Sequence, residues 1–167
     1  MAGCAEFVDW LLEAADRARL ESARARRHRL ARDLVRTFVP ELVVCGVDLR
    51  TWLAPGARRS RTADPVDDAW DADAFRPALT DGGQGSEALR HLAAGAAVVL
   101  TRRQFLIPAA NILDWAQGLV RRRRQEARAE ICGNRTGAEI GRLLADYLRG
   151  GLTRDDLKRR LRTLVCG

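Results

Sequence analysis

The residues best suited to acid–base chemistry lie near the start of a helix predicted to begin at Ser86. Glu87 and His91 are four residues apart, so their side chains project from one face of that helix. A carboxylate beside an imidazole can orient the ring and favour its protonation, which suits general acid–base catalysis. The same spacing also describes an ordinary intrahelical pair that only stabilises the helix. The sequence leaves both interpretations open.

A second polar segment lies further along the chain. Glu130 and Asn134 are again four residues apart, in a stretch that mixes polar with small residues. If their helix packs against the helix carrying His91, the polar side chains converge in a cleft between two helices, where a small active site can form. In the alternative interpretation, Asn134 caps its helix and the charged groups stay in solvent. The predicted catalytic set is Glu87, His91, Glu130 and Asn134.

A run of arginines is the strongest candidate for anion binding. Four of them are consecutive, and a fifth follows one helical turn later. Clustered guanidinium groups bind phosphate through paired donors. The alternative is a solvated helix face, neutralised by nearby glutamates or covered by the aspartates of residues 64–73. No aromatic side chains that could stack on bases are interleaved here. The predicted anion-binding set is Arg121, Arg122, Arg123, Arg124 and Arg128.

The cysteines and glycine-rich segments contain no metal or cofactor motif. The four cysteines form no C-x-x-C pair, and the chain has only two histidines, His28 and His91, so their spacing predicts no metal site. The segment 81–91 lacks the lysine of a phosphate-binding loop, so no cofactor is predicted. No secretion signal is visible at the N-terminus, and we expect reduced thiols. We expect Cys132 to be a small packed hydrophobe rather than a nucleophile activated by His91.

The composition predicts an all-α fold. Hydrophobic residues make up 47% of the chain but aromatic residues only 5%, so the core must consist largely of Leu, Ala and Val, which favours helices. We predict a single-domain bundle of about five to seven helices. Residues 1–53 hold N-terminal helices, either one long helix or two that break near Ser22. Residues 54–85 are irregular, acidic and rich in Gly and Pro, with Trp70 and Phe75 packed on the body. Residues 86–167 form the helical core.

Two local patterns bear on how the helices pack and on whether the chain contains a strand. Gly133, Gly137 and Gly141 are four residues apart within a predicted helix, where each glycine costs about 1 kcal/mol relative to alanine. Their register indicates a groove that receives a neighbouring helix at short distance, and the alanine-rich face of residues 93–97 is the natural partner. The apolar run 42–47 is less decisive, because it fits either a strand or a buried helical turn.

The charge of the chain narrows the class of partner. The formal net charge is +7, which favours an anionic partner. Lys158 is the only lysine, as expected from codon bias in a GC-rich bacterial genome, so the choice of arginine means less than the net charge does. No apolar stretch approaches the roughly 20 residues that span a bilayer, and we expect a cytoplasmic protein.

These observations support three hypotheses of function. The first is a basic helical binding or adaptor module for an anionic partner, with nucleic acid as the first guess. The second is a small hydrolase or toxin-like effector enzyme that uses the predicted catalytic set in a polar cleft between two close helices. The third is a structural subunit of a protein assembly or homo-oligomer, held by the apolar face of the first or last helix.

Overall fold

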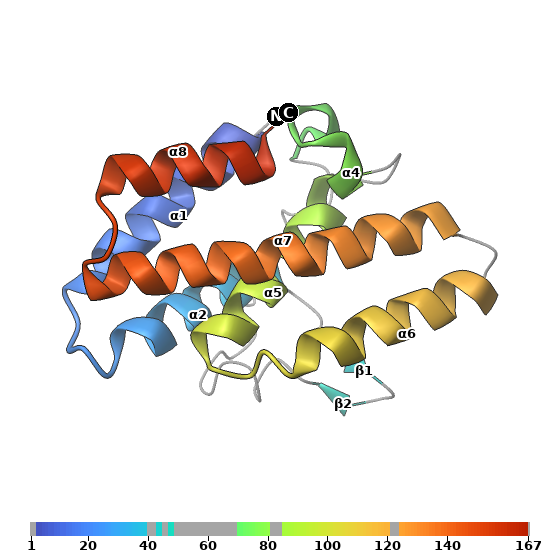
Figure 1. The fold of residues 1–167 in the computed structure, drawn as a ribbon, viewed down its shortest axis with the longest axis horizontal. Coiled ribbons are helices and arrows are strands. Elements are labelled where there is room, and N and C mark those ends of the chain that lie inside the picture. The colour runs from blue at the N-terminus through green and yellow to red at the C-terminus, as the bar shows by residue number, and fades with distance from the viewer. Residues whose placement is uncertain are drawn as a thin grey trace.

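The computed structural model describes residues 3–39, 43–44, 47–48, 70–80, 85–120 and 124–166, and within these ranges the fold is all-α, as predicted (Figure 1). The long helices are α1 (Cys4–Arg19), α2 (Arg26–Phe38), α5 (Gly85–Leu100), α6 (Leu106–Val120), α7 (Arg124–Arg149) and α8 (Arg154–Val165). A 3-10 turn, η1 (Ala72–Ala74), and a single-turn helix, α4 (Pro77–Thr80), precede α5.

The structure answers two questions that the sequence left open. The N-terminal helical pattern belongs to two helices, because the chain leaves α1 after Arg19 and enters α2 at Arg26. The described residues of the apolar run 42–47 belong to two short strands, β1 (Val43–Val44) and β2 (Val47–Asp48), which pair antiparallel. Strands of two residues are too short to form an independent sheet, so this pair does not alter the fold class.

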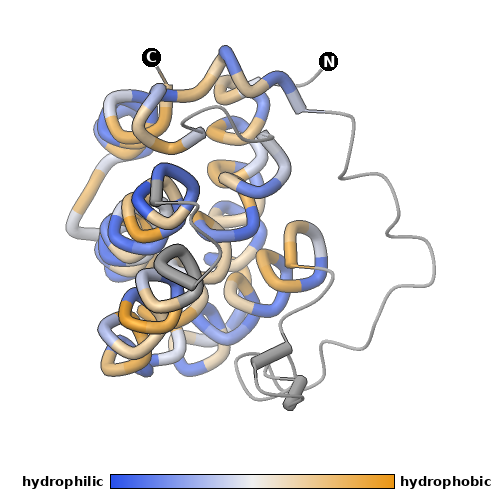
Figure 2. Tube along the Cα trace, turned by 90° about the vertical axis from the view of Figure 1, so that its right-hand side faces the viewer, coloured by the Kyte–Doolittle hydropathy of each residue, from blue (hydrophilic) through white to orange (hydrophobic). Residues whose placement is uncertain are grey.

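Helix α5 occupies the centre of the bundle. Its apolar residues from Ala88 to Leu100 are buried, apart from the half-buried Ala94. Helices α7 and α2 both pack on α5, while α6 packs mainly on α7 and α1 packs against α8 (Figure 1). Colouring by hydropathy shows hydrophobic and hydrophilic residues alternating around the helical turns, as expected for helices that are buried on one face (Figure 2).

The predicted close approach of two helices is confirmed for α5 and α7. A methyl group on Gly137 would overlap the backbone carbonyl of Leu92, and one on Gly141 would lie 2.7 Å from the carbonyl oxygen of Ala96. The contact is reciprocal, because Gly95 on α5 also faces the backbone of α7. The two backbones therefore touch without intervening side chains, which requires glycine on both helices.

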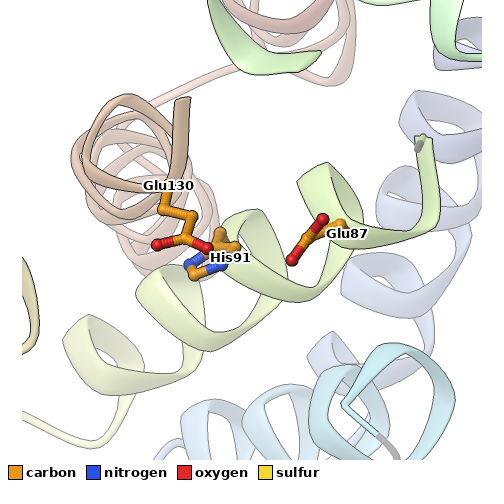
Figure 3. Close-up of side chains that lie close together, drawn as sticks. All are labelled: Glu87, His91 and Glu130. Carbon is orange, nitrogen blue, oxygen red and sulfur yellow. The ribbon is translucent and has the colours of Figure 1, made fainter. Parts of the chain in front are cut away.

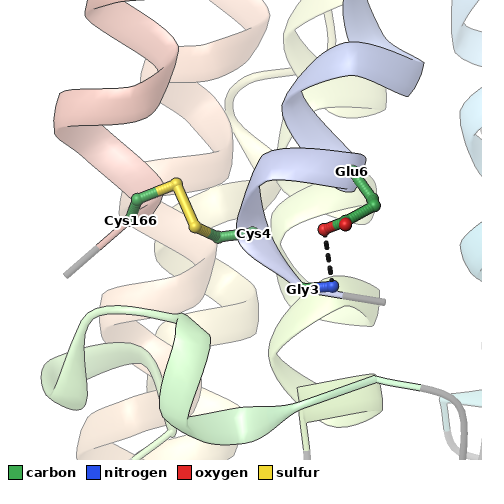
Figure 4. The surroundings of a disulfide bond; sticks show 4 residues. All are labelled: Gly3, Cys4, Glu6 and Cys166. Carbon is green, nitrogen blue, oxygen red and sulfur yellow. Dashed lines mark hydrogen bonds between the residues drawn. A yellow bond between two sulfur atoms is a disulfide. The ribbon is translucent and has the colours of Figure 1, made fainter. Parts of the chain in front are cut away.

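The expectation of reduced thiols is wrong for the pair Cys4 and Cys166, which form a disulfide (Figure 4). Helix α1 packs against α8, and this brings the first residue of α1 beside the residue that follows α8, with their Cα atoms 5.4 Å apart. That distance suits a disulfide. Cysteine spacing along the sequence could not reveal the contact, since 162 positions separate the two residues.

The end of the irregular segment packs on the body, as predicted from its aromatic residues. Phe75 is fully buried and forms an isolated bridge with Cys166. The ring of Trp70 makes edge contacts with Phe7 at 6.5 Å and with Phe38 at 5.9 Å between centroids. Residues 51–69, which include Asp64, Asp67 and Asp68, lie outside the described residues.

Candidate active site between α5, α6 and α7

The close packing of α5 on α7 brings His91 against Asn134. A Cβ on Gly133 would lie 2.8 Å from the Cβ of His91, so the absence of a side chain there makes room for the histidine beside α7. The Nδ1 atom of His91 lies 3.0 Å from Oδ1 of Asn134, and Asn134 is only 7% exposed. Two members of the predicted catalytic set therefore share a hydrogen bond between neighbouring helices.

Two residues of α6 extend this contact into a network. Nδ2 of Asn134 donates to Oδ2 of Asp114 at 2.8 Å and to Oδ1 of Asn111 at 3.2 Å. A carboxylate only accepts hydrogen bonds, so Asp114 fixes which end of the Asn134 amide faces it. The amide oxygen must then face His91, and Nδ1 of the ring must be the donor. In the neutral imidazole this leaves Nε2 with its lone pair available.

Asn111 and Asp114 were not among the predicted site residues, although the sequence contains a signal for them. They are three residues apart, on one face of a helix whose other polar residue is Gln117. Polar side chains on one face of an otherwise apolar helix need a polar partner when they are buried. That pattern predicts a buried polar contact, but it does not tell which helix provides the partner.

The two glutamates of the predicted set lie at the edge of the same network. One ligand atom each from Glu87, His91 and Glu130 can be chosen so that all three lie within 4.8 Å of one another. Glu130 projects from α7 towards His91, while Glu87 lies one turn away on α5 (Figure 3). A small open pocket beside them is lined by Leu79, Thr80, Glu87, His91, Glu126 and Glu130, among others. The four predicted residues therefore lie together, and solvent reaches the two glutamates and His91.

The carboxyl groups of the site are partly removed from water, and this shifts their pKa values. Burial raises the pKa of Asp114, while the positive form of His91 and the hydrogen bond from Asn134 oppose the shift. Burial likewise raises the pKa of Glu130. His91 opposes that shift, and the negative charges of Asp114, Glu87 and Glu126 add to it. The pocket is therefore a local concentration of negative charge in a basic protein.

The predicted anion-binding arginines are mostly beyond what the structure describes. Arg121, Arg122 and Arg123 lie outside the described residues, as does the side chain of Arg124, the first residue of α7. Arg128 is on α7 and is exposed. Cys132 is half-buried and packs against the core, consistent with its predicted role as a small hydrophobe.

No protein-family model, curated protein or solved structure matches this chain. Likeness to known proteins therefore adds nothing to the geometry of the site. Among the described residues, no helix combines the length and the apolar character needed to cross a membrane.

Proposed function

We propose that the protein is a small hydrolase whose catalytic centre is His91. The observation that supports this proposal is the chain of hydrogen bonds from Asp114 through Asn134 to Nδ1 of His91. An imidazole that is oriented through one nitrogen and open at the other is the usual form of a histidine general base. Asn134 is the positioning residue, and Asp114 holds Asn134 in turn.

The proposed reaction is the attack of water on an anionic ester, with the phosphodiester of a nucleic acid as the first candidate. Nε2 of His91 takes one proton from the water as its oxygen bonds to phosphorus. The imidazolium then returns that proton to the oxygen of the leaving alcohol, so the ring ends the cycle neutral. The net charge of +7 would concentrate such a substrate at the surface of the protein.

The two histidines of the chain provide a matched experiment. We expect His91→Ala to lower the hydrolysis rate at least about a hundredfold, as is usual for loss of a general base. His28→Ala is the control, because His28 is exposed on α2. Both variants would be assayed by release of nitrophenol from bis(p-nitrophenyl) phosphate and by cleavage of labelled RNA and DNA, with circular dichroism to verify folding. Equal rates for the two variants, or no hydrolysis by the wild type, would contradict the proposal.

A second candidate function is binding of an anionic partner, and one observation away from the pocket favours it. Burial lowers the pKa of Arg27, and the positive charges of Arg149 and Arg102 lower it further. The start of α2, the end of α7 and the residues after α5 therefore place three guanidinium groups near one another. A phosphate group placed among them would relieve their mutual repulsion.

Salt-dependent binding tests this second candidate. We expect labelled duplex and single-stranded DNA to bind at low salt, with an affinity that falls steeply as salt rises. The variant Arg27→Gln/Arg149→Gln would bind more weakly and reduce the slope of log K against log salt by about two for duplex DNA. Arg36→Gln, which removes an exposed arginine from α2, is the control. No retention of the wild type at low salt would exclude this function for nucleic acid.

The third hypothesis, an assembly subunit, needs a different surface from the one predicted. The apolar faces of α1 and α8 are not available, because residues such as Leu11 and Leu161 are fully buried within the bundle. The large apolar side chains that are most exposed around α6 are Phe105, Ile112 and Trp115. A protein contact would therefore use α6 rather than the first or last helix.

A further inference from the structure

The pocket beside His91 presents an electrostatic problem for the proposed hydrolase. The protein carries a net charge of +7, yet this pocket is lined by Glu87, Glu126 and Glu130, and Asp114 lies close enough to affect the pKa of Glu130. Carboxylates so placed would repel a phosphate or any other anionic substrate. They would instead attract a cation, and a bound cation would make the same pocket favourable for an anion.

We propose that Glu87, His91 and Glu130 bind a divalent transition-metal cation. Imidazole nitrogen and carboxylate oxygen together form a mixed donor set of the kind that binds Mn²⁺, Fe²⁺ or Zn²⁺. Cysteine and histidine spacing predicted no metal site, because that criterion takes no account of carboxylates. The donors here come from two helices, with Glu87 and His91 on one face of α5 and Glu130 opposite them on α7.

The separations of the donors suit this role with a small adjustment. One ligand atom from each residue, with either ring nitrogen of His91 counted, can be chosen so that all three lie within 4.8 Å of one another. Ligands on opposite sides of such a cation are separated by about 4.4 Å at most, twice a bond length of about 2.2 Å. A shift of a few tenths of an ångström therefore brings the widest pair into range. Exposed Glu87 can supply it by rotation of its side chain.

The hydrogen bond from His91 to Asn134 is the second observation that points to a cation. Histidines that bind metals usually donate their other ring nitrogen to a carboxylate or carbonyl oxygen, which fixes the tautomer and aims the free nitrogen at the metal. Here Nδ1 donates to Oδ1 of Asn134, and Asp114 holds the amide in place. Nε2 is thus prepared to be the ligand, and three protein ligands leave positions open for water.

This inference deepens the proposed function and changes its chemistry in a measurable way. If Nε2 binds a cation, it cannot also take the proton from water, and water is activated by coordination instead. Hydrolysis by a cation-bound centre would then be lost on treatment with a chelator and restored by Mn²⁺ or Zn²⁺. Hydrolysis by a metal-free imidazole would survive the same treatment. Cation binding itself can be measured without any substrate, so each proposal can fail without the other.

Isothermal titration of the untagged, chelator-treated protein with Mn²⁺ or Zn²⁺ tests the inference directly. We expect one cation per chain, and a decrease in affinity of at least about tenfold in each of the isosteric variants Glu87→Gln and Glu130→Gln. The control is Glu139→Gln, which changes an exposed carboxylate further along α7 and should bind like the wild type. Failure of both cations to bind at millimolar concentration, or equal affinity in all three variants, would overturn the inference.

A spectroscopic readout covers the case in which a variant folds poorly. Mn²⁺ is paramagnetic and broadens the proton signals of side chains near it. With only two histidines in the chain, we expect Mn²⁺ to broaden the ring signals of His91 and to leave those of His28 sharp, in the unaltered protein. The variant His28→Ala assigns the signals. Sharp His91 signals in the presence of excess Mn²⁺ would reject the site.

Discussion

Removal of the Cys4–Cys166 disulfide is expected to lower the free energy of unfolding by about 4–5 kcal/mol. The bond closes a loop across a sequence separation of 162 residues, and in the chain-entropy description a disulfide stabilises mainly by restricting the unfolded state, more so for longer loops. A domain of ordinary stability has only about 5–15 kcal/mol in total. The folded state of the reduced protein should therefore be only marginally more stable than its unfolded state.

Urea denaturation of the variant Cys4→Ala/Cys166→Ala, compared with the wild type, measures this effect. Cys132→Ala is a matched control, because it alters a half-buried cysteine outside the disulfide. A reducing agent should destabilise the wild type and leave the double variant unchanged, which separates loss of the bond from loss of packing. A double variant as stable as the wild type would contradict the prediction. In a reducing compartment such as the cytoplasm the disulfide would tend to be reduced. The stability of the protein there would be that of the reduced form.

The second large effect is expected from Gly137→Ala, which should lower the free energy of unfolding by about 2 kcal/mol. The added methyl group would overlap the backbone carbonyl of Leu92 and lie 3.0 Å from that of His91. Overpacking of this kind typically costs about 1–3 kcal/mol, and backbone atoms cannot rotate away as a side chain can. Alanine would regain up to about 1 kcal/mol of helix propensity, which leaves the net effect clearly unfavourable.

Thermal unfolding followed by circular dichroism would measure this loss of stability, with an expected decrease in Tm of about 4–8 °C for a chain of this size. Glu139→Ala is the control on the same helix, because Glu139 is exposed and its loss should change stability by less than about 0.5 kcal/mol. Comparison of the two variants separates the loss of stability caused by a methyl group between α5 and α7 from the loss caused by any substitution in α7. A stabilised Gly137→Ala variant would show that α5 and α7 can move apart at little cost.

The fold could be predicted largely because its determinants are local. Composition predicted the α-helical class, and the spacing of Gly133, Gly137 and Gly141 identified the tightest contact. The ends of helices have local signals as well, namely Gly150 after α7 and Thr153 before α8. In the structure α7 ends at Arg149, Gly150 has a φ of +85°, and Thr153 accepts a hydrogen bond from the backbone of Asp156. Each of these features depends on a few consecutive residues, so the sequence contains the whole signal.

The site was predictable only in part, because it depends on contacts between helices. Glu87 and His91 share a helix, as do Glu130 and Asn134, and the glycine register indicated that the two helices meet. Asn111 and Asp114 come from a third helix whose orientation no local pattern specifies. The disulfide was missed for the same reason, since Cys4 and Cys166 meet through the packing of α1 on α8. Relations between distant segments follow from the assembled core rather than from any short stretch of sequence.

The cross-link between the two ends of the bundle also determines how the protein would respond to mechanical force. Cys4 is the first residue of α1, and Cys166 follows α8. Tension applied through the two ends of the chain would pass across the bond between these cysteines, and the residues between would carry none of it. Pulled in this way, the oxidised protein would extend only by the few residues outside the disulfide, because the bond between Cys4 and Cys166 would then bear the force. Under a reducing agent the same force would unravel the bundle, beginning at α1 and α8.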